Sequence, residues 1–148
     1  MIVEVSSGET PEEVRAFLDS QWPSANLEVF GWADQSRWKP REFLITAREA
    51  GELAGVATVR ILGGRGHLGQ LLIRRDLRGQ GVGARLLEEY EALCRQHSCH
   101  KLVLETYKDS RSERFYVRHG YEREAVFERD LHGIDWVRLM KFLDSRDE

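Results

Sequence analysis

Apolar residues recur along this chain with two different periods, which predicts a fold that mixes strands and helices. Alternating or continuous apolar runs are typical of strands. Such runs lie at 2–5, 42–49, 53–62, 67–75, 101–107, 121–131 and 134–143. Two short turn-forming stretches, "EAGE" (49–52) and "GGRG" (63–66), join three of these runs and indicate antiparallel hairpins.

Apolar residues with helical spacing lie between the first predicted strand and the second, and again at two later places in the chain. Thr10 opens "TPEEVRAFLDSQW", where a capping hydroxyl, Pro11 at the first helical position and Glu13 predict a helix start. The aromatic stretch at 23–42 has no clean period, and we expect a short helix followed by a mobile loop. Two later helices are indicated, one with an apolar face of Val82, Leu86, Tyr90, Leu93 and Cys94, the other at 112–120 and closed by Gly120.

This order of elements predicts an α/β (α+β) fold with a mixed, mostly antiparallel sheet of about six or seven strands. One strand–helix–strand crossover, around residues 67–107, makes its two strands parallel neighbours. The length of 148 residues fits a single domain, 1–148, in which the polar tail 144–148 is expected to fray.

Composition narrows the class of protein further. Hydrophobic residues make up 41% and charged residues 32%, which is a soluble globular balance. No apolar run approaches the ~20 residues of a membrane span, and the first residues show no signal-peptide pattern, so we expect a cytoplasmic protein. A net charge of −3 argues against a nucleic-acid partner.

The cysteines and histidines of "CRQHSCH" (94–100) are potential metal ligands that lie within one short segment. Zinc sites usually pair two ligands with a second, distant pair, so we expect no metal site and two free thiols, Cys94 and Cys99. Trp32 and Trp38 either form a wall over a substrate or cap the open end of the core, and the sequence leaves both readings open.

Glycines and arginines are concentrated where the fourth apolar run meets the next helix. Glycines let the backbone turn tightly there and approach a ligand closely, and the first amides of a helix attract anions. Four arginines, Arg74, Arg75, Arg78 and Arg85, add positive charge to this joint. The stretch lacks the lysine and hydroxyl of a P-loop and the G-x-G-x-x-G spacing of a dinucleotide site. A local phosphate site of another kind is therefore indicated.

The segment "LLIRRDLRGQGVGARLL" (71–87) resembles the acetyl-CoA-binding motif of the GNAT superfamily of N-acetyltransferases. In that motif Arg/Gln-x-x-Gly-x-Gly/Ala opens a helix after an apolar strand, and here it begins at Arg78. A second family feature, a strand and a helix later, is matched by Phe115, Tyr116, Gly120 and Tyr121. The resemblance spans roughly residues 53–121 and implies the GNAT fold, with a splayed parallel strand pair that holds acetyl-CoA.

The resemblance also implies which residues bind this cofactor, from which coenzyme A is the product. The pyrophosphate is expected against the amides of 79–84 and the pantetheine arm along the preceding strand. The expected cofactor-binding residues are Leu71, Leu72, Ile73, Arg78, Gly79, Gln80, Gly81, Val82, Gly83, Ala84, Asp109 and Tyr116. Asp109 stands where many members carry asparagine, and an aspartate can only accept hydrogen bonds.

In such enzymes a neutral primary amine attacks the acetyl thioester, which implies an acid, a base and an oxyanion donor. The amide of Ile73 is placed to polarise the thioester carbonyl, and Tyr116 to protonate the leaving thiolate. Glu105 and His67 are the local candidates for the base, with a water chain as the alternative.

The implied acceptor is a small-molecule amine or a peptide or protein amine, and small size favours the former slightly. A non-catalytic acyl-CoA-binding module of the same fold is the alternative, and an anion or nucleotide binder unrelated to coenzyme A is a second one. Pairing of the late strands across a two-fold axis leaves a homodimer open.

Overall fold

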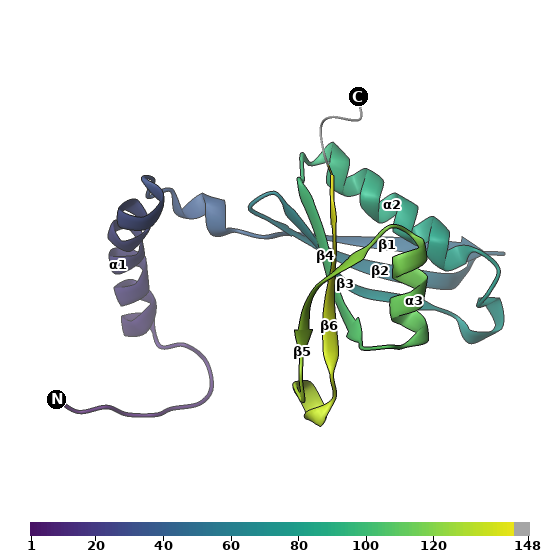
Figure 1. Ribbon diagram of the computed structural model, residues 1–148. Helices are drawn as coiled ribbons and strands as arrows, with labels where there is room; N and C mark the ends of the chain where they lie inside the picture. The colour runs from purple at the N-terminus through teal and green to yellow at the C-terminus, as the bar shows by residue number, and fades with distance from the viewer. Residues whose placement is uncertain (144–148) are drawn as a thin grey trace. The chain divides into compact units, whose positions relative to one another are not determined.

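The computed structural model describes residues 1–143, and these form parts of two compact units, Met1–Lys39 and Pro40–Glu148 (Figure 1). The prediction of a single domain over 1–148 stays a prediction, and the expected frayed tail lies outside the described residues.

The first unit is helical. Helix α1 (Glu12–Phe30) is followed by a 3-10 turn, η1 (Gln35–Trp38). The predicted strand at 2–5 is wrong: these residues are exposed and pair with none of the six strands described. A short apolar run becomes a strand only when a neighbouring strand takes up its backbone hydrogen bonds, and local sequence cannot supply that neighbour.

Helix α1 is longer than predicted, because it continues through Pro23 to Gly31. The separate short helix expected within 23–42 is instead the second part of α1, since the one hydrogen bond that proline removes does not end the helix. The helix ends where Gly31 adopts a left-handed conformation (φ 73°) and donates its N–H to the carbonyl of Leu27. The Thr10 hydroxyl does not cap this helix: Pro11 takes the N-cap position, without a side-chain cap.

The second unit is built on one six-stranded sheet with the order β1-β2-β3-β4-β6-β5. Its strands are β1 (Arg41–Glu49), β2 (Glu52–Leu62), β3 (Arg65–Ile73), β4 (Lys101–Tyr107), β5 (Glu122–Phe127) and β6 (Trp136–Phe142). All neighbours are antiparallel except β3 and β4. The mixed, mostly antiparallel sheet with one parallel pair is as predicted.

Both predicted hairpin turns are present. Ala50 and Gly51 join β1 to β2 with positive φ, and Gly63 and Gly64 do the same between β2 and β3. Two-residue turns of this kind match the right-handed twist of the strands, which sets the register of all three.

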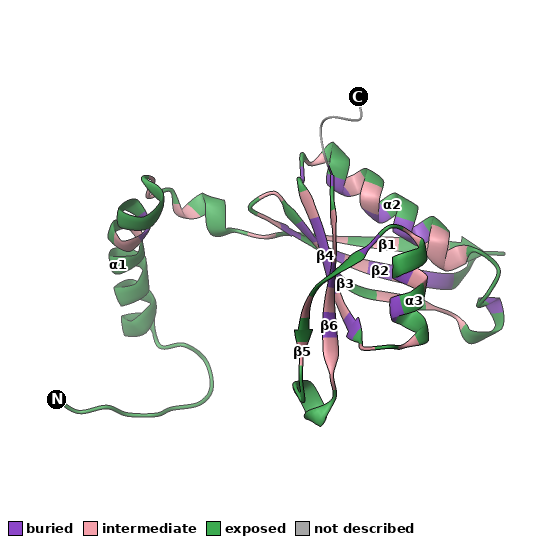
Figure 2. Ribbon diagram, viewed as in Figure 1, coloured by how far each residue is buried: buried purple, intermediate pink, exposed green. Residues whose placement is uncertain are grey.

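Helix α2 (Val82–Gln96) is the crossover between β3 and β4, and α3 (Arg111–Arg118) follows β4. Both helices lie on the same face of the sheet, and the buried residues follow the central strands and the inner side of α2 (Figure 2). Of the predicted apolar face of α2, Leu86, Tyr90 and Cys94 are fully buried. Cys94 and Cys99 are buried free thiols, as predicted.

Tyr90 carries a buried hydroxyl that donates to the carbonyl of Gly66 at 2.9 Å and so ties α2 to β3. We expect Tyr90→Phe to lower the free energy of unfolding by about 1–2 kcal/mol, because the substitution removes a buried hydrogen bond without removing volume. Urea denaturation measures the change. Tyr107→Phe is the control, since Tyr107 is about half exposed, and an equal loss in both variants would contradict this role.

No helix within residues 1–143 is long and apolar enough to cross a membrane. The cytoplasmic location stays a prediction.

Candidate active site

The parallel strands β3 and β4 are paired over only part of their length. Their register runs from Arg65 opposite Lys101 to Leu68 opposite Leu104 and ends there. From Gln70 to Ile73, β3 keeps its pairing with β2, and from Gly69 onward it has no partner on the β4 side. The splayed pair that the family resemblance implied is therefore present, and it begins at the middle of β3.

A β-bulge at Gly69 determines which groups of β3 face the unpaired side. The register with β2 shifts there, so that Thr58 opposes Gln70 while Val59 opposes Leu68. Beyond the bulge the Arg74 N–H donates to the carbonyl of Ala54 on the β2 side. Because backbone groups alternate along a strand, the N–H groups of Leu71 and Ile73 point away from β2. Both are thus free to meet a ligand.

The glycine-rich joint leads directly from β3 into α2. Gly79 and Gly81 have φ values of 76° and 86°, and Gly81 is the N-cap of the helix. These left-handed conformations are easy for glycine and costly for other residues. The first amides of α2 lack intrahelical acceptors, so this end of the 15-residue helix presents donors and partial positive charge.

A cleft of about 390 Å³ lies between the end of β3, the joint, the start of α2 and α3. Nine of the twelve expected cofactor residues line it: Leu71, Leu72, Ile73, Arg78, Gly79, Gly81, Gly83, Ala84 and Tyr116. Side chains of Gln80, Val82 and Asp109 lie outside this lining. Gln80 instead donates to the carbonyl of Asp76.

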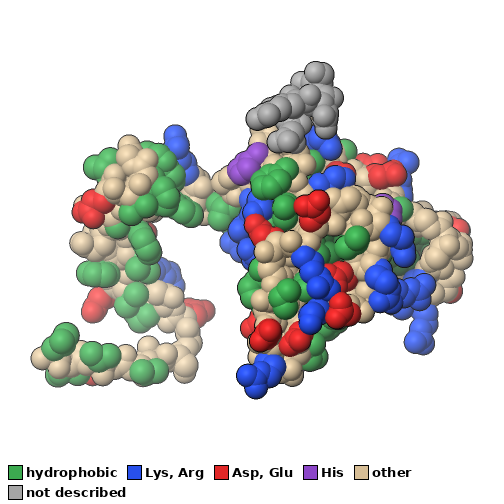
Figure 3. Space-filling view, viewed as in Figure 1, with side chains coloured by type: hydrophobic (Ala, Val, Ile, Leu, Met, Phe, Trp, Pro, Cys, Tyr) green, Lys and Arg blue, Asp and Glu red, His purple; other side chains and the backbone are tan. Residues whose placement is uncertain are grey.

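Three arginines line the cleft, and only Arg78 was expected among them. Arg111 and Arg118 come from α3, on either side of the aromatic pair of the second family feature. None of the three forms a salt bridge with a carboxylate among residues 1–143. Basic side chains gather on the side of the molecule where α3 lies (Figure 3). The cleft is therefore suited to a polyanionic ligand.

Two other arginines of the joint, Arg74 and Arg85, are engaged elsewhere. Arg74 pairs with Asp76 at 2.7 Å and with Glu52 at 3.4 Å, which holds the joint against the β1–β2 hairpin. Arg85 pairs with Glu89 one turn along α2. The arginine-rich joint does line the cleft, as its sequence indicated. Only one of the three arginines in the cleft comes from the joint, however, and the other two come from α3.

Gly81 allows a specific test of the joint, because an added Cβ would meet nothing within 4 Å and only its φ is demanding. We expect Gly81→Ala to lower the free energy of unfolding by about 1–2 kcal/mol. We also expect it to weaken acetyl-CoA binding about tenfold, since relief of the strain moves the helix-start amides. Urea denaturation and titration calorimetry measure the two effects.

Gly51→Ala is the matched control, because Gly51 has a φ of 82° and open space around it but lies in the β1–β2 hairpin. It should cost similar stability and leave acetyl-CoA affinity unchanged. Equal affinity losses in the two variants would show that the joint has no special part in binding.

Tyr116 lies on α3 with its ring in the core and lines the cleft. Phe115 and Tyr121 pack edge-on against this ring, with centroid distances of 5.1 and 5.8 Å. Burial raises the pKa of the Tyr116 hydroxyl to about 12. The phenol is therefore protonated at neutral pH and can release a proton there but cannot serve as a base.

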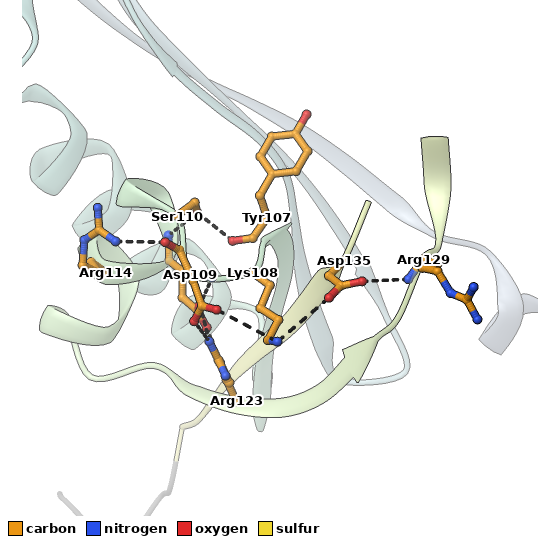
Figure 4. A network of polar contacts seen from close by, with 9 residues as sticks. Tyr107, Lys108, Asp109, Ser110, Arg114, Arg123, Arg129 and Asp135 are labelled. Carbon is orange, nitrogen blue, oxygen red and sulfur yellow. Dashed lines mark hydrogen bonds and ion pairs between the residues drawn. The ribbon is translucent and has the colours of Figure 1, made fainter. Parts of the chain in front are cut away.

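The loop before α3 is held by a polar network that includes Asp109 (Figure 4). Ser110 caps α3 by accepting from the N–H of Glu113, whose carboxylate accepts from the N–H of Asp109. Arg123 binds the carboxylates of Asp109 and Glu113 at 2.7 and 2.5 Å. A capping signature in the sequence, "SRSE" (110–113), could have indicated this arrangement. Asp109 therefore fixes α3, and its expected contact with the cofactor stays a prediction.

Glu105 lies on the face of the sheet opposite α2. Its carboxylate accepts from His67 Nε2 at 2.6 Å and from Arg138 at 2.8 and 3.0 Å. These bonds, that from His67 above all, lower the pKa of Glu105 to about 2. A carboxylate with so low a pKa is a poor acceptor of a proton at neutral pH.

A mixed sheet with a splayed parallel pair, and a cleft between that pair and the start of a glycine-capped helix, is the architecture of acetyl-CoA-dependent acetyltransferases. The chain belongs to the GNAT acetyltransferase family, whose family model, "Acetyltransferase (GNAT) family", matches residues 11–121. The family and the class of enzyme expected from the sequence are thereby confirmed.

Solved structures show the same fold at low sequence identity. An acetyltransferase from Bacillus cereus ATCC 14579 superposes with a TM-score of 0.71 at 20% identity, over 94% of this chain and 98% of that one. A GNAT family acetyltransferase from Elizabethkingia anophelis, solved with acetyl-CoA bound, superposes with a TM-score of 0.63 at 16% identity, over 68% of this chain and 75% of that one.

One curated relative is similar in sequence. "Glucosamine 6-phosphate N-acetyltransferase 1" of Dictyostelium discoideum is 26% identical over 68 residues, which are 46% of this chain. The match spans 42% of that relative's length, which is less than half.

Proposed function

We propose that this protein is an N-acetyltransferase that transfers the acetyl group of acetyl-CoA to a primary amine. The observation that carries the proposal is the cleft, where the free backbone of β3, the start of α2 and Tyr116 meet. A helix start alone would suit many anions. Unpaired strand amides beside it suit a ligand that continues from a phosphate into an amide-containing arm.

Acetyl-CoA supplies an acetyl group activated as a thioester. The amides of 79–84, with Arg78, Arg111 and Arg118, would hold its phosphates. Leu71 would bind the pantetheine arm through its free backbone N–H, whereas the Ile73 carbonyl accepts from Arg78 Nε at 3.2 Å. The Ile73 N–H would face the thioester carbonyl, and such donors are typically worth about 3–4 kcal/mol in transition-state stabilisation.

Tyr116 would protonate the leaving sulfur. Tyr116 lines the cleft, and its raised pKa keeps the proton on the phenol until a strong base, the thiolate, forms beside it. Phe115 and Tyr121 pack against the Tyr116 ring and hold it in place.

We favour a small-molecule amine as the acceptor over a peptide or protein amine. The curated relative is named for acetylation of glucosamine 6-phosphate, which supports a small acceptor. An amino sugar, a polyamine or an aminoglycoside would fit this class.

A thermal melt tests the proposal first. Acetyl-CoA and coenzyme A should raise the melting temperature, whereas ATP and NAD at equal concentration should have little effect. A shift with ATP or NAD alone would indicate a nucleotide site of another kind. Release of coenzyme A over a panel of glucosamine 6-phosphate, spermidine, kanamycin and a lysine peptide should then identify the acceptor class. Tight binding of acetyl-CoA without turnover would favour the non-catalytic module.

A further inference from the structure

We propose that Arg75 binds an anionic group of the acceptor, a phosphate or a carboxylate, and that the acceptor is therefore a small amine that also carries negative charge. The inference rests on the proposed acetyl transfer and deepens it, because it names the class of acceptor. Arg75 belongs to the arginine-rich joint, but unlike Arg74 and Arg85 it has no carboxylate partner among residues 1–143. It does not line the cofactor cleft either. Neither the ion pairs of the fold nor the cleft therefore uses its charge.

A second hollow, of about 320 Å³, lies beside Arg75 at the end of β3. Its walls are residues 53–56 of β2, Leu72 and Ile73 of β3, and Arg74, Arg75 and Arg78 of the joint. Three of these residues, Leu72, Ile73 and Arg78, also line the cofactor cleft. The hollow and the cleft therefore share part of their walls.

The end of β3 lies between the two spaces. Ile73 points towards α2, because an added Cβ on Gly83 would lie 3.7 Å from Ile73 Cγ1. Side chains alternate along a strand, so Leu72 points to the opposite face, where it is 60% exposed. Since this part of β3 has no partner on the β4 side, no strand of the described sheet separates the hollow from the free edge of β3. The hollow thus borders the same residue, Ile73, whose N–H would face the thioester.

The hollow carries positive charge that is not neutralised. Arg74 is paired with carboxylates at 2.7 and 3.4 Å, but no acidic residue is among those that line the hollow. Arg78 donates through Nε to the carbonyl of Ile73 at 3.2 Å, and its terminal nitrogens form no hydrogen bond within residues 1–143. Arg75 is exposed, and one 3-10 turn, closed by the Arg78 N–H, places it beside Arg78. Two guanidinium groups are therefore available to a ligand.

These groups select for a particular kind of amine. A guanidinium binds a phosphate or a carboxylate through two parallel hydrogen bonds. Aliphatic side chains of Leu53, Val56 and Leu72 provide an apolar wall for the carbon skeleton of a small ligand. A polyamine or an aminoglycoside carries only positive charge and would be repelled by the arginines. An amino-sugar phosphate or an amino acid has both the amine and the anion that the hollow requires.

Two matched pairs of amines test the assignment, because the members of each pair differ in the anionic group. Glucosamine 6-phosphate with glucosamine tests for a phosphate, and γ-aminobutyrate with butylamine tests for a carboxylate. We expect wild type to show a KM at least tenfold lower for the anionic member of one pair, which identifies the anion. Arg75→Gln should raise the KM for that member about tenfold or more, since a hydrogen bond to a charged group is lost. The kcat and the affinity for acetyl-CoA should change less than threefold.

Three controls separate this role from a general effect of charge. Arg85→Gln removes one positive charge from the same joint, but Arg85 lines neither space, and we expect it to behave as wild type. Arg75→Lys keeps the charge and loses the planar fork, so its KM should lie between those of wild type and Arg75→Gln. Calorimetric titration of the coenzyme A complex with the anionic amine should show the same order of affinities without turnover.

Equal KM values within both pairs, or the same loss in Arg75→Gln for anionic and uncharged amines, would overturn the assignment and leave the proposed acetyl transfer standing. Turnover confined to purely cationic amines would also overturn it. A loss of acetyl-CoA affinity in Arg75→Gln would contradict it as well, because Arg75 would then serve the cofactor. Absence of both turnover and acetyl-CoA binding in wild type would overturn the proposed function together with this inference.

Discussion

Tyr116→Phe is expected to lower kcat for acetyl transfer about 100- to 1,000-fold while the affinity for acetyl-CoA changes less than threefold. Removal of the hydroxyl removes the proton donor for the thiolate but keeps the ring that packs with Phe115 and Tyr121. A positioned general acid is typically worth 10²–10⁴ in rate. Steady-state kinetics with an accepted amine, combined with calorimetric titration of acetyl-CoA, measures both quantities.

Tyr121→Phe is the matched control for this prediction. It also deletes the hydroxyl of a buried tyrosine, but that hydroxyl donates to Glu91 and the residue lies outside the cleft lining. We expect a small loss of stability and an unchanged kcat. If Tyr116→Phe kept wild-type turnover, sulfur would leave without help from this residue, and the assignment of the acid would be wrong.

Gly83→Leu is expected to weaken acetyl-CoA binding at least 100-fold without unfolding the protein. Gly83 lines the cleft within the first turn of α2, and an added Cβ would lie 3.5 Å from Phe115 and 3.7 Å from Ile73. A methyl group therefore fits, but a leucine side chain has no space except the cleft itself. Leucine favours a helix by about 0.8 kcal/mol over glycine, which offsets part of any repacking cost.

Gly83→Ala is the internal control, since its methyl group makes only ordinary contacts. We expect its affinity to stay within threefold of wild type and its melting temperature to rise slightly. Titration calorimetry and thermal melts of the three proteins compare the effects. Normal acetyl-CoA affinity in Gly83→Leu would show that the cofactor does not pass between α2 and α3.

The elements of the second unit were predictable because each has a strong local signal. Both hairpins follow from turn residues that accept positive φ, and α2 from apolar residues at helical spacing between two apolar strands. Local signals in the first unit were less reliable. Residues 2–5 alternate like a strand but have no strand partner within residues 1–143, and the short helix expected within 23–42 is a continuation of α1.

Most of the lining of the cleft was predictable for a different reason. Nine of the expected residues lie close together in the chain or in the second family feature, so their positions follow from one joint and one helix. Asp109 shows where a role carried over from a family motif is not sufficient. Its carboxylate is bound by Arg123, 14 residues away, and no local sequence pattern signals that contact.

By itself the sequence determined the family, the order of the elements in the sheet unit and the glycine joint, because these depend on residues that are neighbours in the chain. Only the tertiary structure decided which charges meet. It showed that Arg111 and Arg118 join Arg78 in the cleft, and that His67, Glu105 and Arg138 meet on the other face. The physical reason is the sheet register, since the bulge at Gly69 and the order β3-β4-β6 bring together side chains that lie 38 and 33 residues apart in sequence.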